Sequence, residues 1–323
     1  MAADSLPSAG RRRLLRATGC ATAAALGPAW AFSQARAPLR VVCLDWTIAE
    51  TALSLGLPLA GLADRRAYAD WVGEPAVPAS TRDVGLRVQP SREVLAQIRP
   101  DLILSSSLLA SVTPLVAAIA PVRLLDFYGA ADPDRTPPWT RFSARTRDVA
   151  RLLLQPQAAT RWLQTANAWM DQAARHPAVV RQRQQPVLVL QCVDARSVRV
   201  YGDSSVFGAA LARLGLPNAW QAPVSMWGSD TVTLERLLGV VPDTRALVIP
   251  PLPRDLSRQL TANPLWQNLP FVRRRQVATL PRVWSFGALP SALRFAGLLI
   301  QALDGRLPGG WSDAPTQPSG APA

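Results

Sequence analysis

Histidine and lysine are the residue types that this chain of 323 residues most conspicuously lacks: it has one histidine, His176, and no lysine. A metal cage built from several imidazoles is therefore excluded, and so is a Ser-His-Asp triad anywhere except around His176. That residue stands in a polar stretch at the predicted end of a helix, which is typical of a solvated side chain. The sequence thus predicts no catalytic residue and no metal ligand.

Nucleotide-binding patterns and long hydrophobic runs are also missing. No G-x-G-x-x-G follows a strand-like run and no G-x-x-x-x-G-K-[ST] occurs, so the usual loops that cradle nucleotide phosphates are excluded. Beyond the N-terminal leader, no apolar run approaches the roughly 20 residues that span a bilayer. The sequence favours neither a nucleotide-dependent enzyme nor a membrane-spanning protein.

Cysteine is scarce and carries little information. Cys43 and Cys192 lie in apolar, strand-like runs far apart in the sequence. An oxidising compartment permits a disulfide between them, but two small buried thiols are the favoured interpretation. Cys20 follows no apolar stretch, so a lipid anchor is not favoured.

The positive charge has no obvious partner. The formal net charge is +13, and its cations are all arginines, a balance that first suggests nucleic-acid binding. The arginines are scattered, however, apart from short clusters at 181–183 and 273–275. We interpret the charge as a solvated basic surface and expect no nucleic acid as a partner.

The N-terminus has the features of an export signal. The run RRRLLR at 11–16 fits the twin-arginine pattern, and a mildly apolar stretch with small residues follows it up to Ala37. A basic disordered tail is the alternative interpretation. We predict a twin-arginine signal peptide over residues 1–37 and a periplasmic mature protein.

The rest of the chain alternates strand-like and helix-like patterns in both halves, which predicts parallel, Rossmann-like sheets. Between the halves, apolar residues recur at helical spacing and only Pro156 interrupts them. The predicted fold class is α/β, with two Rossmann-like lobes joined by a single long helix. The predicted segments are an N-terminal lobe over 38–140, a linker helix over 141–175, a C-terminal lobe over 176–304 and a disordered tail over 305–323.

Several tryptophans stand on turn signals, where a core would not use them. Trp71 lies in DWVGEP, Trp227 in MWGS and Trp284 in VWSFG, while Arg87 ends the segment DVGLR. Rings on turns predict an apolar cup for a bulky ligand, in which one guanidinium orients oxygen acceptors. The alternative for Arg87 is an ion pair with Asp83 or Glu74. Trp220 and Trp266 are interpreted as packing residues.

A family resemblance adds to this interpretation. From about Arg40 to Leu303 the chain resembles the periplasmic ferric-hydroxamate siderophore-binding proteins of ABC importers, the FhuD-like group with a helical backbone. The resemblance implies a binding protein and not an enzyme, a monomer that delivers an iron–siderophore complex to the permease subunits of an importer. Because iron arrives already chelated, no cofactor is implied. The segments that carry the resemblance are RVV at 40–42 with Trp46, WVGEP at 71–75, DVGLR at 83–87, PNAWQ at 217–221, WGS at 227–229, PLW at 264–266, PFVR at 270–273 and VW at 283–284.

The resemblance also implies roles for individual residues. Arg87 would donate hydrogen bonds to hydroxamate oxygens, which suit a planar guanidinium better than a point charge. Leu109 stands nearest to a tyrosine that shares this task in many members, and Ser285 stands where an aromatic residue is expected, so we expect a roomier site. The organic scaffold would pack against Trp71, Trp227, Trp284 and Phe286, with Trp46 either in this wall or in the core.

Docking to the permease depends on acidic side chains in this family. Glu235 fits the position on the second lobe. On the first lobe Pro114 and Leu115 stand where a glutamate is expected, which leaves another acid such as Glu93, or a weaker contact. Two further interpretations of the whole chain stay open at this point: the same fold binding haem or cobalamin, and, more remotely, an exported α/β hydrolase.

Overall fold

The computed structural model describes residues 39–129, 136–252 and 255–307. The predicted signal peptide and the predicted tail beyond residue 307 lie outside these residues. Within them, no helix combines the length and the apolar composition needed to cross a lipid bilayer.

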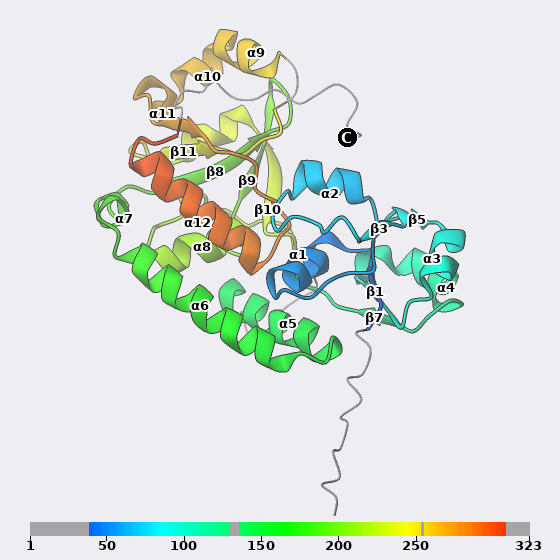
Figure 1. The fold of residues 1–323 in the computed structure, drawn as a ribbon. Helices are drawn as coiled ribbons and strands as arrows, with labels where there is room; N and C mark the ends of the chain where they lie inside the picture. Colours follow the sequence, from blue (N-terminus) through cyan, green and yellow to red (C-terminus); the bar gives the residue numbers. More distant parts are fainter. Residues whose placement is uncertain (1–38, 130–135, 253–254, 308–323) are drawn as a thin grey trace, which may run out of the picture. The chain divides into compact units, whose positions relative to one another are not determined.

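Five parallel strands form the sheet of the first lobe, in the order β3-β2-β1-β6-β7 (Figure 1). Alternate residues of the central strand point to opposite faces, Val41 and Cys43 into one apolar cluster, Val42 and Leu44 into another. Because a parallel sheet is covered on both faces, its strands read as uninterrupted apolar runs. The strands are β1 (Val41–Cys43), β2 (Gly61–Leu62), β3 (Arg82–Asp83), β6 (Leu102–Ser105) and β7 (Val122–Leu124).

Two helices of this lobe, α1 and α3, start at residues whose side chains cap them. Asp45 caps the first helix and Ser91 caps α3, each accepting hydrogen bonds from backbone N–H groups of the first turn. A small antiparallel hairpin of β4 and β5 precedes α3. The elements are α1 (Trp46–Ser54), α2 (Arg65–Trp71), β4 (Gly85–Leu86), β5 (Gln89–Pro90), α3 (Arg92–Ile98), the 3-10 helix η1 (Ser107–Val112) and α4 (Thr113–Ala117).

The second sheet, ordered β10-β9-β8-β11-β12, is only partly the predicted repeat of the first. β8, β11 and β12 are parallel, but β9 and β10 pair antiparallel. The reason is a tight turn after β8, in which Asp194 Oδ1 accepts hydrogen bonds from the backbone N of Arg196 and of Ser197, both at 2.7 Å. The strands are β8 (Val187–Cys192), β9 (Ser197–Tyr201), β10 (Ser229–Thr233), β11 (Arg245–Val248) and β12 (Val277–Thr279).

The helices of the second lobe cover both faces of its sheet. Trp220 and Trp266 lie buried in the apolar cluster on one face, which confirms their interpretation as packing residues. α8 begins after Ser205, whose Oγ accepts from Gly208 N, and ends at Gly215 with φ +70. The helices are α8 (Val206–Leu214), the 3-10 helix η2 (Leu234–Gly239), α9 (Leu256–Ala262), α10 (Pro264–Asn268), α11 (Pro270–Arg273) and α12 (Leu289–Leu303).

The segment between the sheets is not the single helix over 141–175 that its periodicity predicts. Pro156 has no N–H with which to continue a helix and disfavours helical backbone at Gln155, and Leu154 adopts φ +58. The prediction of one helix was wrong for this reason. Two helices stand in its place, α5 (Pro138–Leu152) and α6 (Pro156–Ala174), and the short α7 (Pro177–Gln182) follows them.

The chain reverses direction between α5 and α6. Trp139 Nε1, at the start of α5, donates a hydrogen bond of 2.9 Å to Asn167 Oδ1, late in α6. Val149 of α5 and Leu163 of α6 enter the same apolar cluster. The helical spacing therefore continues through the break because both helices turn an apolar face to one core.

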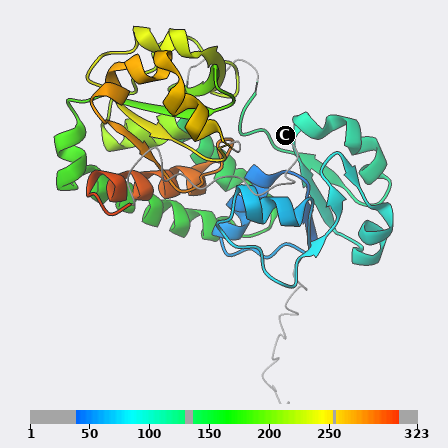
Figure 2. The same cartoon turned by 90° about the horizontal axis from the view of Figure 1, so that it is seen from above.

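One apolar cluster runs through both lobes. Phe295 and Leu299 of α12 are wholly buried in it together with Ile48 of α1. α12 packs against α8 and α6 and also contacts α1. Figure 2 shows the first lobe, in blue to teal, beside the second, in green to orange. The lobes are thus joined by shared packing in addition to the connecting helices.

His176 and the two cysteines have structural positions. His176 caps α7, where its Nδ1 accepts from Ala178 N at 3.3 Å, and its Nε2 lies 3.8 Å from Asp304 Oδ2. Cys43 and Cys192 are buried free thiols, which confirms the favoured interpretation, and burial raises the pKa of both.

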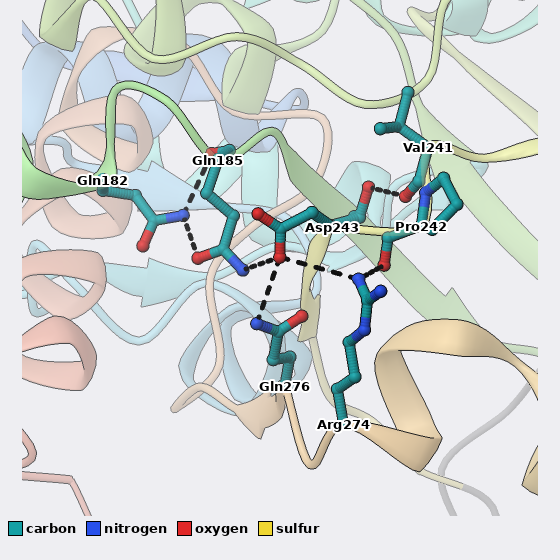
Figure 3. A network of polar contacts seen from close by, with 8 residues as sticks. Gln182, Gln185, Val241, Pro242, Asp243, Arg274 and Gln276 are labelled. Carbon is teal, nitrogen blue, oxygen red and sulfur yellow. Dashed lines mark hydrogen bonds and ion pairs between the residues drawn. The ribbon is translucent and has the colours of Figure 1, made fainter.

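A polar network ties together the amino ends of three parallel strands in the second lobe (Figure 3). Asp243 Oδ1, just before β11, accepts from Gln185 Nε2, before β8, at 3.4 Å and from Gln276 Nε2, before β12, at 3.5 Å. Arg274 Nη1 lies 3.7 Å from the same carboxylate and donates to Pro242 O at 2.6 Å. None of these residues lines the cavity described below, so we assign the network a structural role.

Candidate ligand-binding site

A cavity of about 360 Å³ opens where the two lobes meet. On the first lobe it is lined by the segments that follow β1, β6 and β7. These are the carboxyl ends of parallel strands, and β1 and β6 are the pair at which the strand order reverses, the usual position of a ligand in such sheets. The lining residues are Asp45, Trp46, Thr47, Arg87, Ser106, Leu108, Leu125, Asp126, Phe127, Tyr128, Trp227, Trp284 and Phe286.

Asp45 and Trp46 form the floor on the first lobe. Asp45 Oδ1 accepts from the backbone N of Thr47 and Ile48, and Oδ2 accepts from Ser106 Oγ at 2.8 Å. Burial raises the pKa of Asp45, although these hydrogen bonds oppose the rise. Trp46 Nε1 donates to Ala63 O at 3.0 Å, which fixes the ring. Trp46 is 3% exposed and lines the cavity, so it belongs to the core and to the wall at once.

Arg87 lies over this floor, on the hairpin of β4 and β5. Its Cζ is 3.9 Å from the centroid of the Trp46 ring, and its Nε is 3.5 Å from Asp64 Oδ2, which also accepts from the Arg87 backbone N at 2.9 Å. Neither terminal Nη atom has a hydrogen-bond partner among the described residues. The guanidinium is thus held by one edge and one face, and its outer donors stay available to a ligand.

The alternative ion pairs considered for Arg87 do not form. Glu74 Oε2 instead pairs with Arg294 Nη1 at 2.5 Å, and Asp83 Oδ1 accepts from the backbone N of Gly85. The alternative partners were therefore wrong, although an ion pair with another acid, Asp64, exists.

Three aromatic residues of the second lobe meet this floor. The ring of Trp284 lies 5.3 Å from that of Trp46 and 5.5 Å from that of Phe286, which in turn lies 6.0 Å from that of Trp227. These T-shaped contacts form a continuous wall across the two lobes. Gly228, with φ +73, permits the turn at Trp227, since a Cβ there would lie 2.5 Å from the backbone of Ser205.

Sequence reasoning missed the contribution of the segment after β7. Phe127 and Tyr128 line the cavity, and the Tyr128 ring lies 6.1 Å from that of Trp227. Asp126 also lines it, and its carboxylate accepts from the backbone N and the Oγ of Ser107. The available signal was positional: these residues follow a predicted strand of a parallel sheet, as Asp45 does.

Three predicted site residues lie outside the cavity lining. Leu109 is 6% exposed in the core, whereas its neighbour Leu108 is 64% exposed and lines the cavity, because η1 is a 3-10 turn that presents the preceding residue. Ser285 is buried and hydrogen-bonds Tyr201. Trp71, at the end of α2, packs against the core with the Arg282 guanidinium 6.0 Å from its ring centroid. The structure thus places these three residues outside the lining, and their roles in ligand binding stay predictions.

Glu235 lies in the first turn of η2 with an exposed side chain. A hydrogen bond with the Thr233 side chain lowers the pKa of this carboxyl. It is placed on the surface and away from the cavity lining, and its role in docking stays a prediction.

With this geometry in hand, the chain can be compared with known proteins. The family model described as "Periplasmic binding protein" matches residues 41–283. The chain belongs to the periplasmic binding protein family. Its resemblance to the FhuD-like group is confirmed by 34% identity to the iron(3+)-hydroxamate-binding protein FhuD of Escherichia coli, over 94% of this chain and 99% of that protein.

Other relatives differ in what their names say they bind. The achromobactin-binding periplasmic protein of Dickeya dadantii is 28% identical over 85% of this chain and 89% of that protein. Among solved structures, FhuD of Vibrio cholerae with Fe³⁺-Desferal bound matches with a TM-score of 0.74 and 26% identity, over 84% of this chain and 99% of that chain. FhuD2 of Staphylococcus aureus, at 14% identity and a TM-score of 0.64, shares the fold.

Proposed function

We propose that this protein binds an iron(III)-hydroxamate siderophore in the cavity between its lobes and delivers it to an ABC importer from the periplasm. The observation that carries the proposal is the pairing of one immobilised guanidinium with an aromatic wall built from both lobes. The identity to a hydroxamate-binding relative over nearly the whole chain supports it independently.

The chemistry of the ligand fits this pairing. Three hydroxamate monoanions neutralise Fe(III), so the complex has no net charge at its core and presents an apolar scaffold around a face of oxygen atoms. The free Nη donors of Arg87 suit those oxygens, and the rings of Trp227, Trp284 and Phe286 suit the scaffold. Iron is the cargo and arrives with its coordination shell complete, so the protein supplies no ligand to the metal.

The charge of the cavity distinguishes hydroxamates from other iron chelates. Among the described residues that line it, Arg87 is the only cation, and Asp64 pairs with it from outside the lining. Asp45 and Asp126 add carboxyl groups. A ferric complex of citrate or of catecholates carries net negative charge, and burying it here would leave that charge without matching cations. The balance therefore favours a neutral complex.

The remaining interpretations of the sequence find less support. A hydrolase with a Ser-His-Asp triad would need an imidazole at the cavity, and the single histidine caps α7 instead. For haem, Tyr128 is the aromatic hydroxyl in the lining, and it already donates to Gly287 O at 2.5 Å. We therefore include in the proposal that the protein performs no catalysis.

A ligand screen by tryptophan fluorescence tests the proposal. Iron bound in the cavity would lie beside Trp46, Trp227 and Trp284 and quench their emission. We expect saturable quenching by ferrichrome and ferrioxamine B, and much weaker quenching by ferric citrate, a ferric catecholate, haem and cobalamin. Tighter binding of haem or cobalamin than of both hydroxamates would overturn the assignment.

Export and delivery are parts of the same proposal. Replacing Arg11 and Arg12 by lysine is expected to retain the precursor in the cytoplasm, as judged by cell fractionation. A Glu235→Ala variant is expected to bind ligand normally, as a monomer, yet to support less uptake. Normal uptake by this variant would remove Glu235 from the docking surface.

A further inference from the structure

Behind the cavity, one corner of the second lobe is held by side chains of the first. The corner runs from Phe286 to Ser291 and joins the loop after β12 to α12. Thr47 Oγ1 donates to Phe286 O at 2.7 Å, and Tyr128 donates to the next carbonyl, Gly287 O, at 2.5 Å. Phe286 itself lines the cavity, so these contacts act directly behind the aromatic wall.

Glu50 makes the central contact of this corner. Its Oε1 accepts from the backbone N of Ala288 at 2.5 Å, and its Oε2 accepts from Ser291 Oγ at 2.6 Å. The side chain comes from α1, one turn after Trp46, and is wholly buried. A glutamate at this depth is costly unless fixed donors satisfy both oxygens, and here two donors of the opposite lobe do so.

The start of α12 has no acceptor of its own. Ala288 occupies its N-cap position without a capping side chain, and the first turn contains no acidic residue. The free N–H groups of a helix start require acceptors and favour a carboxyl group. Glu50 supplies from the first lobe what α12 lacks in its own sequence.

The fit around this carboxyl is tight. A Cβ at Gly287 would lie 2.8 Å from Glu50 Oε1 and 2.1 Å from Ser291 Oγ. The corner can thus approach Glu50 because position 287 carries no side chain. This closeness leaves the corner few alternative positions while the carboxyl is in place.

We infer that Glu50 is a positioning residue for ligand binding: by capping α12 across the lobe boundary, it sets where Phe286 stands beside Trp284, whose ring meets that of Trp46, and so the position of the aromatic wall. It does not line the cavity and touches no ligand. The inference concerns the arrangement of the wall, and its consequence for affinity rests on the proposed function.

A first experiment measures, without any ligand, how firmly the corner at 286–291 is held. Hydrogen exchange of the Ala288 amide is compared, at a temperature where all variants are folded, for the wild type and for Glu50→Ala, Glu50→Gln and Glu50→Asp. We expect exchange to be roughly tenfold faster or more in Glu50→Ala, since its hydrogen bond is lost. Glutamine keeps one acceptor for Ala288 and can donate to Ser291 Oγ, so Glu50→Gln should stay near the wild type. Aspartate is shorter and should behave like alanine.

A second experiment measures ferrichrome affinity of the same variants by fluorescence quenching. We expect about a tenfold loss in Glu50→Ala and Glu50→Asp, and rescue to within about threefold in Glu50→Gln. The matched control is Glu93→Ala, since Glu93 is likewise a helical glutamate of the first lobe but is exposed in the first turn of α3 and hydrogen-bonds locally, with Ser91 Oγ. It should change neither readout.

The outcomes separate the two proposals. If Glu50→Ala melts at a lower temperature but keeps wild-type exchange at Ala288 and wild-type affinity, Glu50 only stabilises the fold and the inference is overturned. If Glu50→Ala does not fold, Glu50→Asp takes its place, because the shorter side chain loses the contact with Ala288, and unchanged exchange and affinity in that variant overturn the inference equally. If the wild type binds no ferric hydroxamate, the proposed function fails while the exchange experiment still decides the role of Glu50.

Discussion

The two lobes build their shared cavity in different ways. The first lobe contributes Asp45 and Asp126, which follow strands of its parallel sheet, and Arg87 on the hairpin of β4 and β5, each held by hydrogen bonds. The second contributes rings on loops, Trp227 before β10 and Trp284 with Phe286 after β12. The polar side chains of the lining thus all come from the first lobe, whereas both lobes contribute aromatic rings. Ligand affinity therefore depends on how closely the lobes are held together.

The largest expected effect comes from removing the contribution of the second lobe. In the double variant Trp227→Ala, Phe286→Ala, loss of two large rings at the centre of the site should weaken ferrichrome binding by about a hundredfold or more. Isothermal titration calorimetry would measure it. Trp169→Ala is the control, because Trp169 is an exposed tryptophan on α6, outside the lining. A loss below tenfold would show that the first lobe alone dominates binding.

The second largest loss of affinity is expected from replacing Arg87, the cation of the cavity lining. Arg87→Ala removes charge-assisted hydrogen bonds worth about 1.5–3 kcal/mol, a loss of roughly tenfold to a hundredfold in affinity. Arg87→Lys should recover only part, because a point charge cannot reproduce the planar fork. Melting temperature should change little, since a partly exposed ion pair contributes at most about 1 kcal/mol.

The control for Arg87 is Arg82→Ala, which removes an exposed arginine of β3 that hydrogen-bonds Gln97. A fall in melting temperature with unchanged affinity in Arg87→Ala would mean that its pairing with Asp64 is structural. The guanidinium would then have no part in recognition.

The free energy of unfolding should depend on pH through Glu50, which lies at the boundary between the lobes. Burial raises the pKa of Glu50 from 4.5 to about 8, helped by the charge of Asp45 and opposed by hydrogen bonds from Ser291 and Ala288. Between these values the folded state holds a proton that the unfolded state has released. The stability that this proton confers is complete below pH 4.5 and is lost as pH rises towards 8, by about 1 kcal/mol for each pH unit.

Urea unfolding of the wild type and of Glu50→Gln at several pH values measures this contribution. Glutamine does not titrate, so the difference between the two proteins isolates Glu50 from Asp45 and the other carboxyls. Parallel pH profiles between pH 5 and pH 8 would contradict the raised pKa.

The smallest expected effect is the change of shape on binding. The lobes share one apolar cluster and the contacts of the corner at 286–291, so they should close little around a ligand. Radii of gyration of ligand-free and loaded protein, measured by solution scattering, should agree within about 1 Å. A larger compaction would show that the lobes separate without ligand and that the corner opens.

Most of the site could be predicted from local signals. Trp227 and Trp284 on turns, and Arg87 at the end of the DVGLR segment, were proposed as cavity residues because the local structure alone does not require a tryptophan or an arginine there. At Leu109 the structure differs from the expected lining, because a single step along a 3-10 turn exchanges a buried position for the exposed position of Leu108. Tyr128 was missed because its role depends on which strand end faces the other lobe.

The fold, like the site, could be predicted from the sequence only in part. Alternating patterns predicted both sheets, but the antiparallel hairpin of β8 and β9 and the break before Pro156 were not recognised. The apolar spacing fits a parallel strand as well as an antiparallel one, and one helix as well as two. The turn at Asp194 and the proline at position 156 decide between these alternatives.

The sequence by itself determined what depends on neighbours along the chain: apolar periodicity, caps at Asp45 and Ser91, and the turn at Gly228. These follow from backbone conformation and from hydrogen bonds within a few residues. Only the tertiary structure decided that Glu50 would cap a helix whose N-cap residue, Ala288, lies 238 residues further along the chain, and that the rings of Trp46 and Trp284 would meet. Such contacts depend on how the whole core packs, and no local pattern contains that information, because the energy of the pair exists only once both lobes have been assembled around it.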